Sequence, residues 1–113
     1  MEARATARQV RGSARKIRQV ADMIRGRSVQ EALNILQFVP KACARPMEKT
    51  VRSAAANAVN MDDENTRDIE DLKIKTVFVD GGPVMKRIHY GPRGSASTIR
   101  KRSSHITVVV VAD

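Results

Sequence analysis

The chain has 113 residues and a formal net charge of +9, from 21 lysines and arginines against 12 aspartates and glutamates. This length suits one domain and excludes two independent hydrophobic cores, and no apolar run reaches the roughly 18 residues that span a membrane. The positive charge favours a polyanionic partner over a membrane or a small-molecule substrate.

The aromatic side chains are too few to hold a single-stranded nucleic acid. Phe38, Phe78 and Tyr90 are the only ones, whereas proteins that hold single strands stack bases on several rings. Lysine and arginine can instead neutralise the phosphates of a folded, duplex-rich nucleic acid. Such binding depends on the shape of the nucleic acid rather than on its sequence. The composition therefore favours that kind of partner.

Cysteine and histidine are too scarce for a metal site. Cys43 is the only cysteine, and His89 and His105 are the only histidines; their spacing fits no metal-ligand pattern. His105 lies beside Ser103 and Ser104, but a histidine within a strand is more often a packing or phosphate-binding group than a catalyst. We therefore predict no metal, no cofactor and no enzymatic activity. The single cysteine and the absence of an apolar block at the N-terminus favour a reducing, cytoplasmic compartment.

A predicted strand and a basic helix open the chain. Residues 2–10 fit a strand, on which Arg4 and Arg8 share one face. Ser13 is placed to cap the helix that follows, and Gly26 stands where a left-handed residue ends it. The apolar side of this helix carries Ile17, Val20, Ala21 and Ile24. The other side carries Arg15, Lys16, Arg18 and Arg25. Taken alone, this basic side is either a solvated surface or a nucleic-acid contact.

Two less charged helices follow. Ser28 and Glu31 form a capping box for the second helix, which Pro40 ends. The third helix is predicted to begin between residues 41 and 46, because a proline is tolerated in a first turn, and to end near Met61. The apolar positions of the two helices are Val29, Ala32, Leu33 and Leu36, then Met47, Val51, Ala54, Ala55, Ala58 and Val59. We expect the lone cysteine to be a small core residue.

Two strands are predicted in the second half of the chain. Residues 62–71 are polar and acidic, which predicts an exposed loop. In residues 72–79 the side chains alternate as in a strand, and one end of this strand is more polar than the other. In residues 104–112, the run Val108–Val111 indicates a strand buried on both faces. The predicted fold is α+β, with three helices packed on a small antiparallel three-stranded sheet and a long protruding β-hairpin, in a single domain of residues 1–113.

The predicted hairpin is residues 81–103, between those two strands. Gly81–Pro83 allow a bulge where the hairpin leaves the sheet, and Tyr90–Gly94 supply turn residues at its tip. Its basic residues, without any acidic one, are Lys86, Arg87, Arg93, Arg100, Lys101 and Arg102. An isolated two-stranded hairpin is marginal in water, so we expect an RNA scaffold to hold it.

Charge is segregated along the chain. Residues 1–61 hold twelve basic and four acidic groups, residues 62–80 three and seven, and residues 81–103 six and none. This segregation indicates two separate surfaces for an anionic partner. A DNA-binding regulator is one rival, because the first two helices resemble a helix-turn-helix, but the second helix is nearly neutral. A basic nuclease is another, but it lacks an acid–base pair or a metal cluster.

Five segments carry a resemblance to a known family. They are residues 13–18 (SARKIR), 24–26 (IRG), 53–58 (SAAANA), 80–88 (DGGPVMKRI) and 104–108 (SHITV). In this order and spacing they resemble bacterial large-subunit ribosomal protein twenty-two, over essentially the whole chain. The resemblance implies a structural constituent of the large ribosomal subunit of a bacterial-type ribosome, which supports subunit assembly.

The same resemblance implies partners and site residues. The body would lie near the exit of the nascent-peptide tunnel, against large-subunit ribosomal RNA and neighbouring ribosomal proteins and not as a homo-oligomer. The hairpin tip would meet the nascent polypeptide through Met85, Lys86, Arg87, Ile88, His89, Tyr90, Gly91, Pro92 and Arg93. The implied RNA-binding residues are Arg4, Arg8, Arg11, Ser13, Arg15, Lys16, Arg18, Arg25, Lys86, Arg87, Arg93, Gly94, Arg100, Lys101, Arg102, Ser103 and His105.

The tip departs from the family pattern. The family usually shows a Pro-Arg-Ala-basic-Gly-Arg stretch there, whereas this chain reads HYGPRGS at residues 89–95. Two expected arginines are missing. The spacing from Gly94 to His105 still fits the family, so the sequence predicts a hairpin of the same length with a less charged tip.

Overall fold

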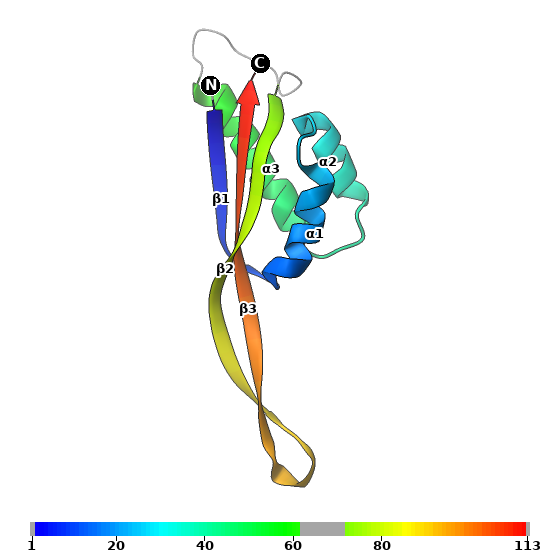
Figure 1. Ribbon diagram of the computed structural model, residues 1–113, viewed down its shortest axis with the longest axis vertical. Helices are drawn as coiled ribbons and strands as arrows, with labels where there is room; N and C mark the ends of the chain where they lie inside the picture. Colours follow the sequence, from blue (N-terminus) through cyan, green and yellow to red (C-terminus); the bar gives the residue numbers. More distant parts are fainter. Residues whose placement is uncertain (1, 62–71, 113) are drawn as a thin grey trace.

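The computed structural model describes residues 2–61 and 72–112; the acidic segment predicted as a loop lies outside them. The elements are, in order, β1 (Glu2–Arg11), α1 (Ala14–Ile24), α2 (Val29–Phe38), α3 (Ala44–Met61), β2 (Leu72–Tyr90) and β3 (Ala96–Ala112). The start of β1 and the end of β3 lie together at one end of the molecule, and the β2–β3 turn lies at the other (Figure 1). The predicted α+β fold with a protruding hairpin is confirmed.

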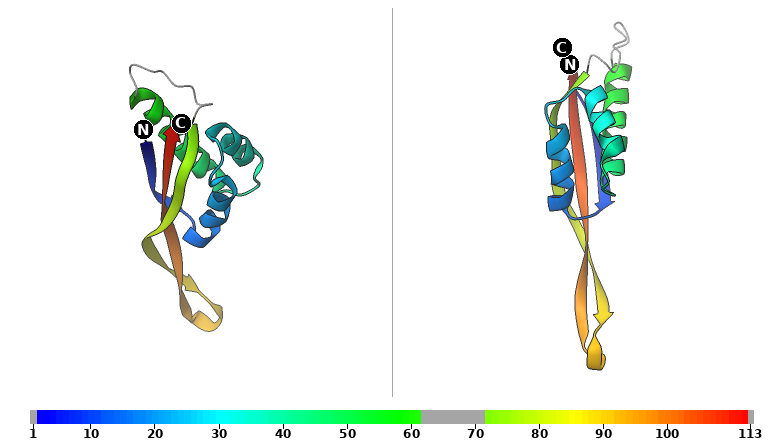
Figure 2. Two further views of the ribbon diagram at one scale, coloured as in Figure 1. Left: turned by 45° about the horizontal axis from the view of Figure 1, so that its top comes forward. Right: turned by 90° about the vertical axis from the view of Figure 1, so that its right-hand side faces the viewer.

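The sheet is antiparallel, with the strand order β1-β3-β2. The three helices cover one face of it (Figure 2), with α1 packed against β2 and α3 packed against β1. The largest fully buried side chains are Ile17, Ile24, Met47, Leu72, Ile74, Ile106, Val20, Val29, Val51, Val77, Val108 and Val110. Removing these apolar groups from water stabilises the body, which positions the basic surfaces described below.

The helix boundaries follow the predicted signals with one exception. Gly26 has a φ of +79°, the left-handed conformation predicted after α1. The Ser28 hydroxyl accepts a hydrogen bond from the Glu31 N–H at 3.3 Å, as expected at the N-cap of α2. Ser13 occupies the N-cap of α1, but its side chain makes no capping hydrogen bond. The predicted N-cap position of Ser13 is therefore confirmed, without the side-chain hydrogen bond that usually accompanies it.

Small residues let α3 approach the rest of the body closely. The helix begins at Ala44, within the predicted range, with Pro46 in its first turn. Ala54, Ala55 and Ala58 are buried on its inner side, as predicted, because a methyl group leaves room for the neighbouring backbone. The sequence pattern therefore predicted the range in which this helix begins and its packing face.

A β-bulge changes the buried face of β2 within the body. Leu72 and Ile74 are buried, and so is Val77, three residues further on. The register with β3 shifts around Lys75, which is the extra residue of the bulge. Phe78 consequently lies on the open face of the sheet, 41% exposed. The simple alternation predicted for this strand therefore fails at the bulge.

The valine run of β3 is fully buried on one face only. Val108 and Val110 are buried under the helices, whereas Val109 and Val111 are partly exposed on the opposite face. No helix or strand within residues 2–61 and 72–112 covers that second face. The prediction of burial on both faces is wrong for this reason.

The arm gives the molecule its length. Its extents are 67 × 24 × 15 Å and its radius of gyration is 17.2 Å, against about 13 Å for a compact chain of this size. Beyond the body, β2 and β3 continue as a two-stranded ladder from the pair Val84–Arg102 to the pair Tyr90–Ala96. No described helix packs on this ladder (Figure 1), so its side chains are exposed.

Candidate nucleic-acid interface

A tight bulge joins the arm to the body. The register between β2 and β3 shifts between Gly81 and Val84, where the sequence predicted it. The Ser103 hydroxyl donates a hydrogen bond to the Pro83 carbonyl at 2.6 Å. A Cβ placed on Gly82 would lie only 2.8 Å from the Ser103 oxygen. The lack of a side chain at Gly82 therefore permits the close approach that sets the direction of the arm.

The end of β1 holds the same joint from the other side. The Gly12 N–H donates to the Arg102 carbonyl at 3.1 Å, and the Ser104 hydroxyl donates to the Gly12 carbonyl at 2.9 Å. Gln9 has a φ of +57°, and its N–H donates to His105 Nδ1 at 3.1 Å. With Nδ1 as the acceptor, Nε2 is the ring nitrogen left to donate. His105 thus stabilises an irregular turn of β1 and keeps one donor for another partner.

The cations of the arm lie on both of its faces. Directly opposed residues of an antiparallel pair share a face, and so do residues two apart in one strand. One face carries Lys86, Arg100 and Arg102, and the other carries Arg87 and Lys101. All five are exposed, and the arm has no acidic residue. This distribution suits an arm with phosphate groups on both sides.

The tip combines a tight turn with an exposed aromatic ring. The Gly91 N–H donates to the Ser95 carbonyl at 2.6 Å, which closes the 3-10 turn Pro92–Gly94. Arg93 adopts a φ of +61° within it, a conformation that costs energy for a residue with a side chain. Tyr90, at the end of β2, is 76% exposed. The turn predicted at the tip is confirmed, and it presents one cation and one ring outward.

The basic side of α1 divides into two parts. Arg18 donates to the carbonyl of Val79 from Nε at 3.0 Å and from Nη2 at 2.8 Å, and Arg25 Nη2 donates to the carbonyl of Val77 at 2.9 Å. These two guanidinium groups therefore stabilise the edge of β2. Arg15 and Lys16 are exposed on the same helix.

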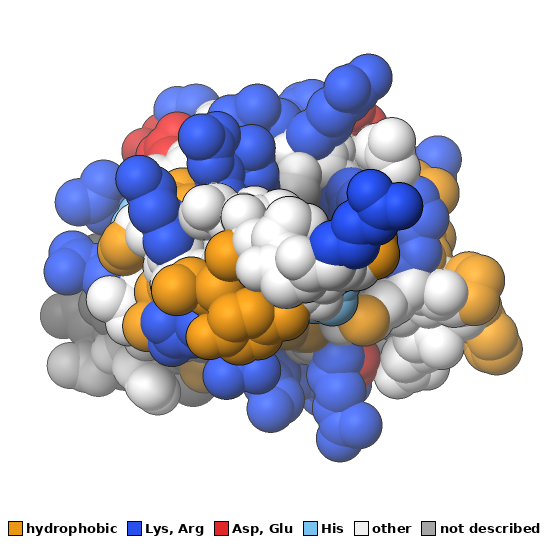
Figure 3. Space-filling view, turned by 90° about the horizontal axis from the view of Figure 1, so that it is seen from below, with side chains coloured by type: hydrophobic (Ala, Val, Ile, Leu, Met, Phe, Trp, Pro, Cys, Tyr) orange, Lys and Arg blue, Asp and Glu red, His pale blue; other side chains and the backbone are white. Residues whose placement is uncertain are grey.

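The remaining predicted cations of the body, Arg4, Arg8 and Arg11, are exposed. Seen along the arm from below, lysine and arginine side chains surround the molecule and acidic groups are few (Figure 3). The Ser13 hydroxyl and the Ser103 hydroxyl lie near the base of the arm, where Ser103 is engaged with β2. The predicted RNA-binding residues thus lie on the arm, on β1 and on α1.

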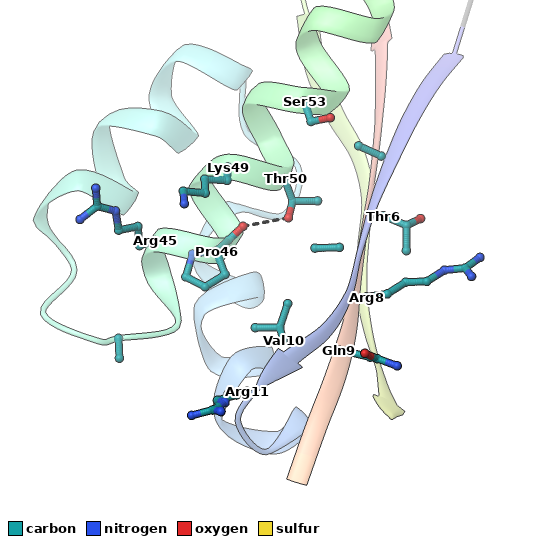
Figure 4. Close-up of a pocket in the computed structure, with 13 residues that line it drawn as sticks. Thr6, Arg8, Gln9, Val10, Arg11, Arg45, Pro46, Lys49, Thr50 and Ser53 are labelled. Carbon is teal, nitrogen blue, oxygen red and sulfur yellow. Dashed lines mark hydrogen bonds between the residues drawn. The ribbon is translucent and has the colours of Figure 1, made fainter. Parts of the chain in front are cut away.

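The structure adds two cations that the sequence reasoning passed over. Arg45 and Lys49 extend from the first half of α3 beside a groove that β1 walls on its other side (Figure 4). Their four-residue spacing on one helix face was visible in the sequence, but nothing there placed that face beside β1. Only the packing of α3 on β1 places these cations and Arg11 along the same groove.

The described residues offer little for other chemistry. Among residues 2–61 and 72–112, no cluster of three or more histidine, cysteine, aspartate or glutamate side chains could hold a metal ion. No helix in that part of the chain is long and apolar enough to cross a membrane. Cys43 is partly buried against the core, in keeping with its predicted packing role.

These features define a class: a small, basic α+β protein whose exposed charge lies on an extended two-stranded arm and on the body beside it. The chain belongs to the family Ribosomal protein L22p/L17e, whose model matches residues 5–111. This confirms the resemblance carried by the five sequence segments.

Bacterial relatives match nearly the whole chain. "Large ribosomal subunit protein uL22" of Desulfitobacterium hafniense (strain DSM 10664 / DCB-2) is 52% identical over 110 residues, which cover 97% of this chain and 94% of that protein. The protein of the same name from Pediococcus pentosaceus is 55% identical over 108 residues, covering 96% and 89%. That of Halothermothrix orenii is 51% identical over 110 residues, covering 97% and 95%.

Proposed function

We propose that this chain is a structural constituent of the large subunit of a bacterial-type ribosome, in the cytoplasm, and that it has no enzymatic activity. Its membership of the L22p/L17e family and the names of its relatives support this role. Its basic surfaces bind large-subunit ribosomal RNA, and its body contacts neighbouring ribosomal proteins. By ordering these partners around itself, the chain supports assembly of the subunit.

The exposed arm is the observation that carries the proposal. Its ladder from Val84–Arg102 to Tyr90–Ala96 has cations on both faces and no covering element among the described residues. Two strands alone bury too little apolar surface to be stable in water, so a scaffold that neutralises both faces stabilises the arm. Ribosomal RNA supplies such a scaffold, because its phosphates line the channels between its helices.

In this proposal the tip of the arm lines the nascent-peptide tunnel and the body lies near the tunnel exit. The exposed ring of Tyr90 and the single cation Arg93 then face either RNA or the nascent polypeptide. Exposed cations of the body, such as Arg15, contact RNA near the outer surface. The proposal thus assigns the two ends of the molecule to two different environments.

Cross-linking within intact large subunits tests this arrangement. A photoreactive amino acid is introduced at Arg15, Lys86 or Tyr90, and the subunits are purified and irradiated. Cross-links to large-subunit RNA from Arg15 and Lys86, with Tyr90 reaching RNA or a stalled nascent chain, are expected. Absence of the protein from purified large subunits would overturn the proposed role, and an arm cross-linked only to its own body would overturn the placement of the arm.

Neutralising the arm tests its contacts with phosphate. Lys86→Gln with Arg87→Gln is expected to lower the slope of log affinity against log salt, for a large-subunit RNA fragment, by up to about two units, one for each lost phosphate contact. Thr98→Ala, on the same arm, is the control without a charge change. An unchanged slope for the double variant would place both side chains away from phosphate.

A further inference from the structure

The two edges of the sheet differ in how their backbone groups are paired. β2 forms one edge and β1 forms the other. Arg18 and Arg25 donate hydrogen bonds to backbone carbonyls of β2. Further along β2, the Ile74 N–H donates to the Arg27 carbonyl at 2.9 Å. The outer edge of β2 is therefore covered within the body, and a covered edge does not pair with a strand from another chain.

β1 leaves part of its outer edge open. Asn57 Nδ2 donates to the Arg4 carbonyl at 3.0 Å, so the backbone groups of Arg4 face away from β3. Alternate residues of a strand turn their backbone groups to the same side, and the N–H and the carbonyl of Thr6 therefore face this edge too. Among residues 2–61 and 72–112, no group forms a hydrogen bond with them. One donor and one acceptor thus lie side by side on an open strand edge.

A groove runs along this edge, between β1 and the first half of α3, with a volume of about 590 Å³. In Figure 4 the Thr6 side chain points away from α3 and the Val10 side chain points toward it. The groove is lined by small apolar side chains, Ala5, Ala7 and Val10 from β1 and Pro46 from α3. Successive side chains of an extended chain point to opposite faces. A segment laid beside β1 therefore places every second side chain against this apolar lining.

The charge beside this edge is positive. Arg8 and Arg11 of β1 flank the groove, whereas Arg45 and Lys49 extend from α3 away from β1, on its outer rim (Figure 4). All four side chains are exposed, and none of the described residues that line the groove is acidic. A second copy of this chain at the edge would bring like charges together. A segment that carries carboxylates instead meets complementary charge.

We infer that the outer edge of β1 binds an extended acidic segment of a neighbouring large-subunit protein, which adds to the sheet as a further strand. The inference rests on the proposed function and names one surface through which the body contacts another ribosomal protein. A polypeptide supplies both a carbonyl for the Thr6 N–H and an N–H for the Thr6 carbonyl. Phosphate oxygens only accept hydrogen bonds, so they match the N–H alone. The apolar side chains of the segment alternate into the groove, and its carboxylates lie near Arg8 and Arg11.

Thr6→Pro tests the inference, because proline removes the outward N–H of an edge strand without removing a hydrogen bond to β3. Thr6→Ala is the matched control, since it loses the same side chain and keeps the N–H. The probe is a short peptide of alternating glutamate and valine, titrated onto the full chain and followed through the backbone amide signals of β1 by NMR. Thr6→Pro is expected to bind this peptide at least about tenfold more weakly than Thr6→Ala. The control should stay within about twofold of the unsubstituted protein.

A second peptide, in which lysine replaces every glutamate, tests the selection by charge. It is expected to bind at least about tenfold more weakly than the acidic peptide, because its ammonium groups meet Arg8 and Arg11. Urea unfolding first shows that both variants fold. Equal binding of the acidic peptide by Thr6→Pro and Thr6→Ala would overturn strand addition at this edge. Equal binding of the two peptides by the unsubstituted protein would overturn the acidic character of the partner.

Cross-linking in intact subunits tests the same edge without any substitution at Thr6. Ser53 lies on the α3 side of the groove (Figure 4), and a photoreactive amino acid introduced there is expected to cross-link to an acidic segment of another large-subunit protein, identified by mass spectrometry. A cross-link to RNA alone, or to a second copy of this chain, would overturn the inference and leave the proposed function intact. Absence of the chain from purified large subunits would instead overturn the proposed function.

Discussion

The Arg18 guanidinium donates two hydrogen bonds to one acceptor, the carbonyl oxygen of Val79, at 3.0 and 2.8 Å. β2 is an edge strand of the sheet, and an edge strand presents unpaired carbonyl groups to any passing strand. Arg25 covers the carbonyl of Val77 in the same way. Two arginines that the sequence presents as free surface charge therefore protect the edge of the sheet.

Arg18→Met is expected to lower the free energy of unfolding by about 1 kcal/mol, the net value of a hydrogen bond of this kind. Urea unfolding followed by circular dichroism measures the change. Arg15→Met, one turn earlier on the helix and exposed, is the matched control and should stay within about 0.5 kcal/mol of the unsubstituted protein. In RNA binding the order reverses, because Arg15 is free to contact phosphate. Equal stability of the two variants would contradict the structural role of Arg18.

Gly82→Ala is expected to destabilise the joint by about 1 kcal/mol, because the new Cβ displaces the Ser103 hydroxyl from the Pro83 carbonyl. Ser103→Ala removes the same hydrogen bond and the obstruction together. The double variant should therefore cost less than the sum of the two single variants, as measured by urea unfolding. Strictly additive costs would show that Gly82 and Ser103 do not meet at the joint.

Removing the arm is expected to leave the body folded. The fully buried side chains all lie outside residues 84–102, so replacement of that range by Asn-Gly, which favours a tight hairpin turn, keeps the whole core. The shortened chain should unfold in one cooperative urea transition with a smaller m-value, in line with the smaller surface exposed. Loss of cooperativity would mean that the arm takes part in folding of the body.

The pH dependence of stability should report the ion pair between Glu2 and Lys75. The hydrogen bond and the positive charge of Lys75 lower the pKa of Glu2 from its ordinary value of 4.5. Because the folded-state pKa is the lower one, the stabilisation is fully present above 4.5 and is lost as the pH falls through the folded-state value. The melting temperature of Glu2→Gln should thus lie below that of the unsubstituted protein at neutral pH and approach it in acid. A constant difference across that range would exclude this ion pair as its source.

Sequence patterns predicted the elements well because each had a local cause. Apolar spacing located α1 and α2, the left-handed conformation of Gly26 followed from its place after a helix, and Gly81–Pro83 marked the bulge at the base of the arm. Each of these signals depends on a few neighbouring residues. The local sequence was therefore sufficient to predict these features.

The errors arose where distant segments meet. The bulge at Lys75 depends on pairing with β3, and it is this pairing that leaves Phe78 on the open face. The Arg18 guanidinium donates to a carbonyl 61 residues away in sequence. The groove beside Arg45 and Lys49 exists only because α3 packs on β1. Such long-range relationships leave no periodic trace in the sequence.

β3 runs without interruption from Ala96 at the tip to Ala112, and within the body it is the central strand. Its C-terminal half is therefore fixed in the middle of the hydrophobic core, and its N-terminal half projects from the body. Sideways displacement of the tip exerts a torque on the valines buried beneath the helices, while tension along the arm loads the hydrogen bonds of β3 to both flanking strands in shear. The same continuity means that a well-packed body limits how far the tip can swing.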